Sequence, residues 1–123
     1  MALIPQSDEQ YLTEKGFQFE IKQSDKEVLL VLKNWSLPDS YTPTLVDLLI
    51  RIVPGYPLAP LDMFWTFPAV KLAGGGWPLN ADVHQQLDGR SWQRWSRHYE
   101  WRPGVDNIRT FITGIKNEIS LGR

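Results

Sequence analysis

The hydrophobic period of this chain changes from two residues to about 3.6 along its length, and this change constrains the fold most. Residues 17–23 alternate apolar and polar side chains. Residues 44–53 do so again, although a helix is also possible there, between the closely bracketing Pro43 and Pro54. The run between them, 27–35, is too apolar for one buried face alone. We predict a strand for each of these runs, and a fourth for the aromatic-rich run at 61–67.

Helices are predicted at the two ends. Ser7, followed by two acidic residues, is expected to cap a short helix that ends at Gly16. Near the other end, the apolar spacing i, i+3, i+4, i+7, i+11 over 108–119 predicts an amphipathic helix, with its start marked by Pro103 or Asp106 and with Gly122 just past its end. The predicted fold class is therefore α+β, a four-stranded antiparallel meander sheet flanked by N-terminal and C-terminal helices.

Composition limits the classes of partner. The length suits one domain, residues 1–123. The net charge of −1 gives no overall attraction to nucleic acid or to an anionic membrane, so neither is expected as a partner. The chain has no cysteine, which excludes disulfides and thiol chemistry. Because no apolar stretch approaches the roughly 18 residues of a membrane span, and the first residues lack a signal-peptide pattern, we expect a cytoplasmic protein.

The segment "GRSWQRWSRHYEW" (89–101) holds three of the six tryptophans, three arginines and one of the two histidines. Trp92 and Trp95 lie three residues apart, which places them on one face if this stretch is helical. They are either core residues or anchors for a partner. Trp101 is interpreted as structural.

The polar side chains of the same segment suggest binding or catalysis. Arginine pairs with carboxylates or phosphates, and a histidine such as His98 can act as a general base. The simpler alternative is a solvated face on which one arginine pairs with an acid such as Asp62 or Asp88. The candidate binding residues are Trp92, Arg94, Trp95, Ser96, Arg97 and His98.

Neither a metal nor a cofactor is expected. The two histidines, His84 and His98, lack the spacing of metal ligands. The run "GGGW" (74–77) lacks the Gly-Lys ending of a phosphate loop, and we interpret it as a flexible flap.

The order of the motifs resembles that of the ubiquitin-conjugating (UBC-like) superfamily. The stretch "VPGYPLAPLDMFW" is similar to the family's Tyr-Pro-x-x-Pro-Pro signature, with Leu61 in place of the second proline. Gly89 suits the loop that follows, and Trp101-Arg102-Pro103 is similar to the Trp-x-Pro before the last helix. The signature positions that match are Tyr56, Pro57 and Pro60. The core "WQRWSRH" looks most similar to the prokaryotic UBC-like family E.

This resemblance implies a UBC-like fold and a part in a bacterial ubiquitin-like conjugation system, with a ubiquitin-like protein and an activating enzyme as partners. The family's cysteine is expected near Ser91, Trp92 or Gln93, and none of these is cysteine. Either the cysteine is naturally absent, or it was deliberately replaced by a serine, which would carry an oxyester. Without a thiolate the standard transfer fails. We therefore expect a pseudoenzyme that acts by protein binding.

Two other hypotheses remain open. In one, the protein is an enzyme without cysteine chemistry, with His98 (or Ser91) as catalytic residue and Arg94 or Arg97 stabilising an anion. In the other, the cluster is structural and the interaction surface lies elsewhere. The binding hypothesis predicts that changing Arg94 and Trp95 to alanine abolishes partner binding with little loss of stability.

Overall fold

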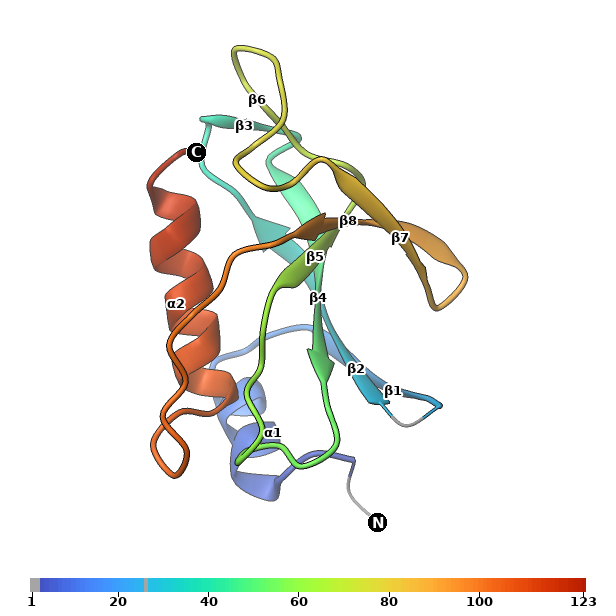
Figure 1. Ribbon diagram of the computed structural model, residues 1–123, viewed down its shortest axis with the longest axis vertical. Helices are drawn as coiled ribbons and strands as arrows, with labels where there is room; N and C mark the ends of the chain where they lie inside the picture. Colours follow the sequence, from blue (N-terminus) through green and yellow to red (C-terminus); the bar gives the residue numbers. More distant parts are fainter. Residues whose placement is uncertain (1–2, 26) are drawn as a thin grey trace.

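The computed structural model describes residues 3–25 and 27–123, which form a sheet covered by helices on one face (Figure 1). The elements, in chain order, are α1 (Gln6–Glu14), β1 (Phe19–Ser24), β2 (Glu27–Ser36), β3 (Tyr41–Thr42), β4 (Leu45–Ile52), β5 (Phe64–Phe67), β6 (Lys71–Leu72), β7 (Val83–Leu87), β8 (Arg90–Trp95) and α2 (Ile108–Ser120). The main sheet is antiparallel throughout and has the order β1-β2-β4-β5-β8-β7, while β3 and β6 form a small separate ladder.

The predicted α+β class is confirmed, and the periodicity explains how the sheet packs. Along β4, Leu48 and Ile50 belong to the core beneath the helices, whereas Leu49 belongs to a cluster on the opposite face. Along β2, Leu30 faces the helices and Leu29 faces away. This is why the run at β2 is apolar at successive positions.

The sheet is wider than the predicted four-stranded meander, because β7 and β8 form a hairpin that adds to the edge of β5. Its two-residue turn is Asp88-Gly89, and both residues have positive φ (50° and 76°), as the tight turn of a hairpin requires. β5 is shorter than predicted, because Met63 also has a positive φ (61°) and interrupts the extended backbone.

Both helix starts differ from the predictions. Ser7 does not cap α1, which already begins at Gln6, and the N–H groups of Asp8 and Glu9 donate to the Pro5 carbonyl. α2 begins after Asn107, whose side chain accepts from the N–H of residue 110 in a capping box. Over the described range, no helix is long and apolar enough to cross a membrane.

The hydrophobic residues form two clusters, one on each face of the sheet. The larger, the helix-side core, lies between the sheet and both helices. The smaller, the outer core, consists of Leu29, Val31, Leu49, Trp65 and Trp92. The β1–β2 and β7–β8 hairpins both project away from α2 (Figure 1).

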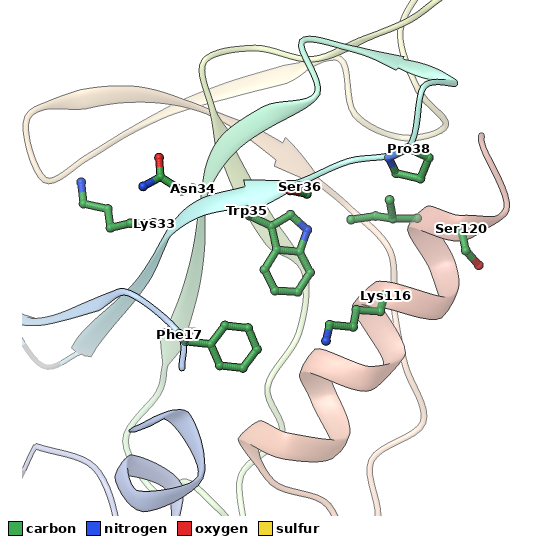
Figure 2. A pocket seen from close by; sticks show the side chains of 9 residues that line it. Phe17, Lys33, Asn34, Trp35, Ser36, Pro38, Lys116 and Ser120 are labelled. Carbon is green, nitrogen blue, oxygen red and sulfur yellow. The ribbon is translucent and has the colours of Figure 1, made fainter. Parts of the chain in front are cut away.

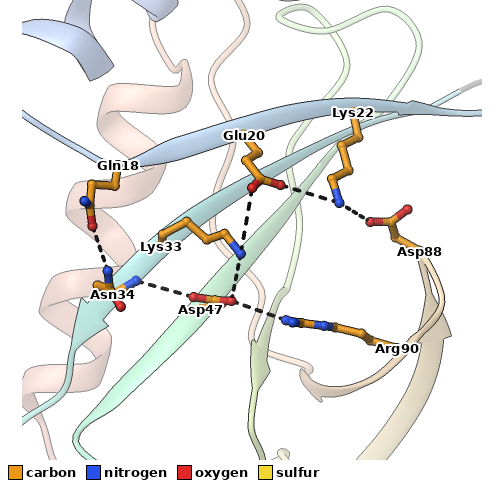
Figure 3. Close-up of polar contacts among 8 residues, drawn as sticks. All are labelled: Gln18, Glu20, Lys22, Lys33, Asn34, Asp47, Asp88 and Arg90. Carbon is orange, nitrogen blue, oxygen red and sulfur yellow. Dashed lines mark hydrogen bonds and ion pairs between the residues drawn. The ribbon is translucent and has the colours of Figure 1, made fainter.

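Charged side chains connect these two hairpins beside the outer core (Figure 3). The Lys22 ammonium on β1 lies 2.7 Å from the Asp88 carboxylate in the β7–β8 turn. Asp47 on β4 pairs with Lys33 at 3.2 Å and with Arg90 at 3.3 Å. The sheet therefore curls so that its two edges approach each other on the face away from the helices.

Candidate functional site

The two tryptophans of β8 lie on opposite faces of the sheet, because β8 is a strand rather than a helix. Trp95 is fully buried in the helix-side core, where its indole N–H donates to Thr66 Oγ1 at 2.9 Å and its ring stacks on Phe64. Trp92 lies in the outer core and donates to the Leu87 carbonyl at 3.0 Å. Of the two interpretations left open for this pair, their burial supports core packing.

The burial of Trp95 also corrects the expectation that it can be truncated with little loss of stability. Removing a tryptophan side chain from a core costs about 3–5 kcal/mol. A binding test that includes Trp95 would therefore report unfolding as well as loss of contact.

Gln93, one of the positions at which the family's cysteine is expected, is fully buried. Its Oε1 accepts from the Val70 N–H at 2.6 Å and from the Thr66 hydroxyl at 3.0 Å. Its Nε2 donates to the carbonyls of Val70 at 2.9 Å and Ala81 at 2.7 Å. All four hydrogen-bonding positions of the amide are used, so Gln93 ties the segment between β5 and β7 to the sheet.

Arg97 is buried too, and its guanidinium is engaged within the protein. Nε donates to the Leu79 carbonyl at 3.1 Å, Nη2 donates to the Arg123 carbonyl, and Nη1 lies 3.5 Å from the Glu118 carboxylate. The guanidinium carbon also lies 4.8 Å from the centre of the Trp95 ring. Arg97 thereby joins α2 to the loop before β7.

The exposed part of the cluster is smaller than the sequence suggested. Arg94 and Ser96 are half-exposed, and Arg94 Nε donates to Ser96 Oγ at 3.1 Å. His98 is the most exposed of these side chains, and its Nδ1 lies 2.9 and 3.0 Å from the two carboxylate oxygens of Asp62. Asp62, expected as a possible partner of an arginine, is instead the partner of the histidine.

A cavity of about 360 Å³ adjoins His98. Its lining combines aromatic rings with a few polar groups, from the segment after β8 and from α2. The lining residues are His98, Tyr99, Glu100, Trp101, Asp106, Thr110, Phe111 and Gly114.

Ser91 is exposed, but it lies at the other end of β8 from His98. At a rise of roughly 3.3 Å per residue, four strand residues already separate the Cα atoms of Ser91 and Trp95 by about 13 Å. Asp62, which pairs with His98, lies two residues before Phe64, the partner of Trp95 in the β5–β8 ladder. His98 therefore lies beyond the Trp95 end of β8. Ser91 and His98 therefore do not form a nucleophile–base pair.

The Tyr-Pro-x-x-Pro and Trp-x-Pro segments meet and brace the two helices. The Tyr56 hydroxyl donates to Asp8 Oδ2 and accepts from the Ile108 N–H, both at 2.7 Å. The Trp101 indole N–H donates to the Pro57 carbonyl at 3.0 Å. Burial raises the pKa of the Asp8 carboxyl above its usual value, and the hydrogen bond from Tyr56 opposes that rise.

The two histidines lie in different surroundings. The His84 ring packs edge-on against Trp77, with 5.5 Å between ring centres, whereas His98 pairs with Asp62. Among the residues placed by the structure, no three His, Cys, Asp or Glu side chains form a group that could hold a metal. The triple-glycine run forms a turn in which the Gly75 N–H donates to the Leu72 carbonyl at 2.8 Å, and its role as a flap stays a prediction.

Comparison with known proteins identifies the family. The family model for prokaryotic E2 family E matches residues 4–121. The chain belongs to this family. No curated protein and no solved structure matches it. The prokaryotic E2 family E assignment confirms the resemblance read from "WQRWSRH", and the sheet with helices on one face fits the UBC-like fold that this family implies.

Sequence reasoning missed the role of Gln93, although a signal was present. On a strand, residues 93 and 95 share a face, and Trp95 marks that face as buried. A glutamine in a core-facing register must find partners for its amide, which identifies it as a hydrogen-bonding residue of the interior. Because this stretch was considered only as a possible helix, the strand register was not recognised.

Proposed function

We propose that this prokaryotic E2 family member is a component of a ubiquitin-like conjugation system that binds the ubiquitin-like protein or its activating enzyme. The observation that carries this proposal is the absence of cysteine from a chain that matches the family over almost its whole length. Thioester transfer requires a thiolate, and the chain has none to offer. Binding is the part of the family's work that needs no thiol.

The proposed contact surface, here named the Arg94–His98 surface, consists of Arg94, Ser96 and His98. Ser96 orients the Arg94 side chain, and Asp62 orients the imidazole of His98. Trp92, Trp95 and Arg97 hold the backbone beneath them from inside the protein. Side chains that are fixed before binding lose less entropy on association. Because the Arg94 guanidinium pairs favourably with carboxylates, this surface suits acidic groups on a partner.

The test is capture of the two partners that the resemblance predicts, the ubiquitin-like protein and the activating enzyme of the same system. We expect the protein to co-elute with one of them in size-exclusion chromatography. The double variant Arg94→Ala, His98→Ala should weaken this binding at least about tenfold. The matched control, Arg109→Ala with His84→Ala, removes the same residue types from exposed positions elsewhere and should bind normally. Equal losses in both double variants would contradict the proposed surface.

The same mixture, supplied with ATP, tests whether the protein acts only by binding. We expect its intact mass to stay unchanged. An adduct with one ubiquitin-like unit that survives thiol but is cleaved by base would indicate an oxyester and a carrier role, with the exposed Ser91 or the half-exposed Ser96 as the acceptor.

A second candidate function rests on the His98–Asp62 pair. A carboxylate that accepts from Nδ1–H leaves Nε2 free to take a proton, which is how a general base is oriented. In this hypothesis His98→Gln abolishes turnover and leaves partner binding intact. In the binding hypothesis the same variant weakens capture, so one pair of measurements separates the two.

A further inference from the structure

A groove of about 350 Å³ lies between the end of β2 and α2 (Figure 2). Its walls are mostly apolar, with polar side chains at the rim. It is lined by Phe17, Lys33, Asn34, Trp35, Ser36, Pro38, Lys116, Ile119 and Ser120. The groove shares no residue with the Arg94–His98 surface.

An irregularity in β2 shapes this groove. The pairing of β2 with β4 shifts register between Leu32 and Trp35, and Asn34 has a positive φ of 54°. One extra residue in a strand reverses the alternation of the side chains that follow it. Trp35 therefore turns to the helix side, as Leu32 does, and its ring lies nearly parallel to Phe17 at 6.1 Å.

Lys116 gives the groove its charge. Its ammonium lies 5.5 Å from the centre of the Phe17 ring and 5.7 Å from that of Trp35, so the two rings hold the cation over the groove. Across the described part of the chain, no carboxylate lies within 4.0 Å of this ammonium. By contrast, Lys33 is already paired with Asp47 at 3.2 Å.

No aspartate or glutamate of the described chain lines the groove. The site therefore joins an apolar floor to one positioned cation with no internal counter-ion. A ligand that complements it carries an aliphatic group for the floor and a single negative charge for Lys116. Among the polar groups at the rim, Asn34 Nδ2 already donates to Gln18 Oε1 and Ser120 Oγ to the Asn117 carbonyl, and the Ser36 hydroxyl suits the polar backbone of a peptide.

We propose that the groove binds an extended segment of a partner protein in which an aliphatic side chain stands next to a carboxylate. The aliphatic side chain packs on Trp35 and Ile119, and the carboxylate pairs with Lys116. This inference goes beyond the proposed function, since it assigns a second surface that does not depend on the identity of the partner bound by the first.

The experiment titrates the ¹⁵N-labelled protein with a peptide of sequence Gly-Leu-Glu-Leu-Asn-Gly, blocked at both ends, and with its neutral twin Gly-Leu-Gln-Leu-Asn-Gly. We expect the amide shifts caused by the acidic peptide to cluster at residues 33–38 and 116–120. At low salt the acidic peptide should bind about three- to fivefold more tightly than the neutral one. Lys116→Gln should remove this preference, and Lys116→Arg should keep it.

The matched control is Lys71→Gln. Lys71 is also exposed and also lies over an aromatic ring, that of Trp77 at 5.0 Å, but outside the groove. It should leave the preference unchanged. Equal affinity for the two peptides, a preference that survives Lys116→Gln, or no shifts in the groove at millimolar peptide would each overturn the proposal. None of these results would alter partner capture through the Arg94–His98 surface, so the two proposals fail separately.

Discussion

At the scale of single residues, Gln93 shows how the chain uses a position where the family's chemistry is expected. Its amide satisfies four polar groups of Val70, Ala81 and Thr66 inside the helix-side core. A reactive group at this position would be enclosed by protein. The position has a structural role here, because the amide holds the segment between β5 and β7 against the sheet.

We therefore predict that Gln93→Leu destabilises the protein by at least about 3 kcal/mol, because it leaves several buried donors and acceptors unpaired. The measurement is urea unfolding followed by tryptophan fluorescence. Gln86→Leu on the exposed face of β7 is the control and should change the unfolding free energy by less than about 0.5 kcal/mol. A Gln93→Leu variant as stable as this control would show that the amide contacts contribute little.

At the scale of elements, one hydroxyl, that of Tyr56, forms hydrogen bonds with both α1 and α2. Tyr56→Phe removes the partner of the buried Asp8 carboxyl and of the first N–H of α2. We predict a loss of about 1–3 kcal/mol in unfolding free energy. The pKa of Asp8, measured by NMR titration of its carboxyl carbon, should rise further, because the hydrogen bond that lowers it is gone.

Tyr99→Phe is the matched control for this variant. The Tyr99 hydroxyl is buried and has no hydrogen-bond partner among the residues that the structure places. Removing it should leave stability unchanged or slightly higher. If the two variants behaved alike, the hydroxyl bridge of Tyr56 would not be what couples the helices.

Elements with a clear hydrophobic period were predictable from the sequence, and those set by turn chemistry were not recognised. The strands β1 and β4 and the helix α2 follow from apolar spacing, and β2 follows from an unbroken apolar run. The sequence signal for the β7–β8 hairpin is Asp88-Gly89, a dipeptide that favours a two-residue turn. Missing it turned a strand into a possible helix, and placed Trp92 and Trp95 on one face instead of two.

The candidate site was predictable in composition but not in exposure. Residues 89–101 do gather arginine, histidine and tryptophan near one another, yet tertiary packing decides which of them reach solvent. Arg97 is buried because three groups distant in sequence, Leu79, Glu118 and Arg123, converge on it. Local sequence patterns do not predict contacts between residues that are distant in the chain. A buried arginine and an exposed arginine therefore cannot be told apart from the sequence around them.

At the scale of the whole molecule, two carboxyls should give the stability of the protein a pH dependence of opposite signs. Hydrogen bonds from the N–H and side chain of Arg102 hold the pKa of Asp106 below its ordinary value of 3.8. The ionised Asp106 carboxylate therefore stabilises the fold fully above pH 3.8, and this stabilisation is lost as the pH falls through the lowered pKa. Burial raises the pKa of Asp8, so its carboxylate destabilises the fold as the pH rises from 3.8 through the raised value.

We therefore predict that the unfolding free energy rises as the pH falls toward 3.8, because Asp8 becomes protonated in the folded protein. Below pH 3.8 the unfolding free energy should fall, because Asp106 loses its stabilising charge. Urea unfolding of the protein and of two variants across this range separates the two. Asp8→Asn keeps a polar group beside Tyr56 and should flatten the profile only above pH 3.8, while Asp106→Asn should flatten it only below. Because each variant serves as the control for the other, a change in the same pH interval for both would contradict these assignments.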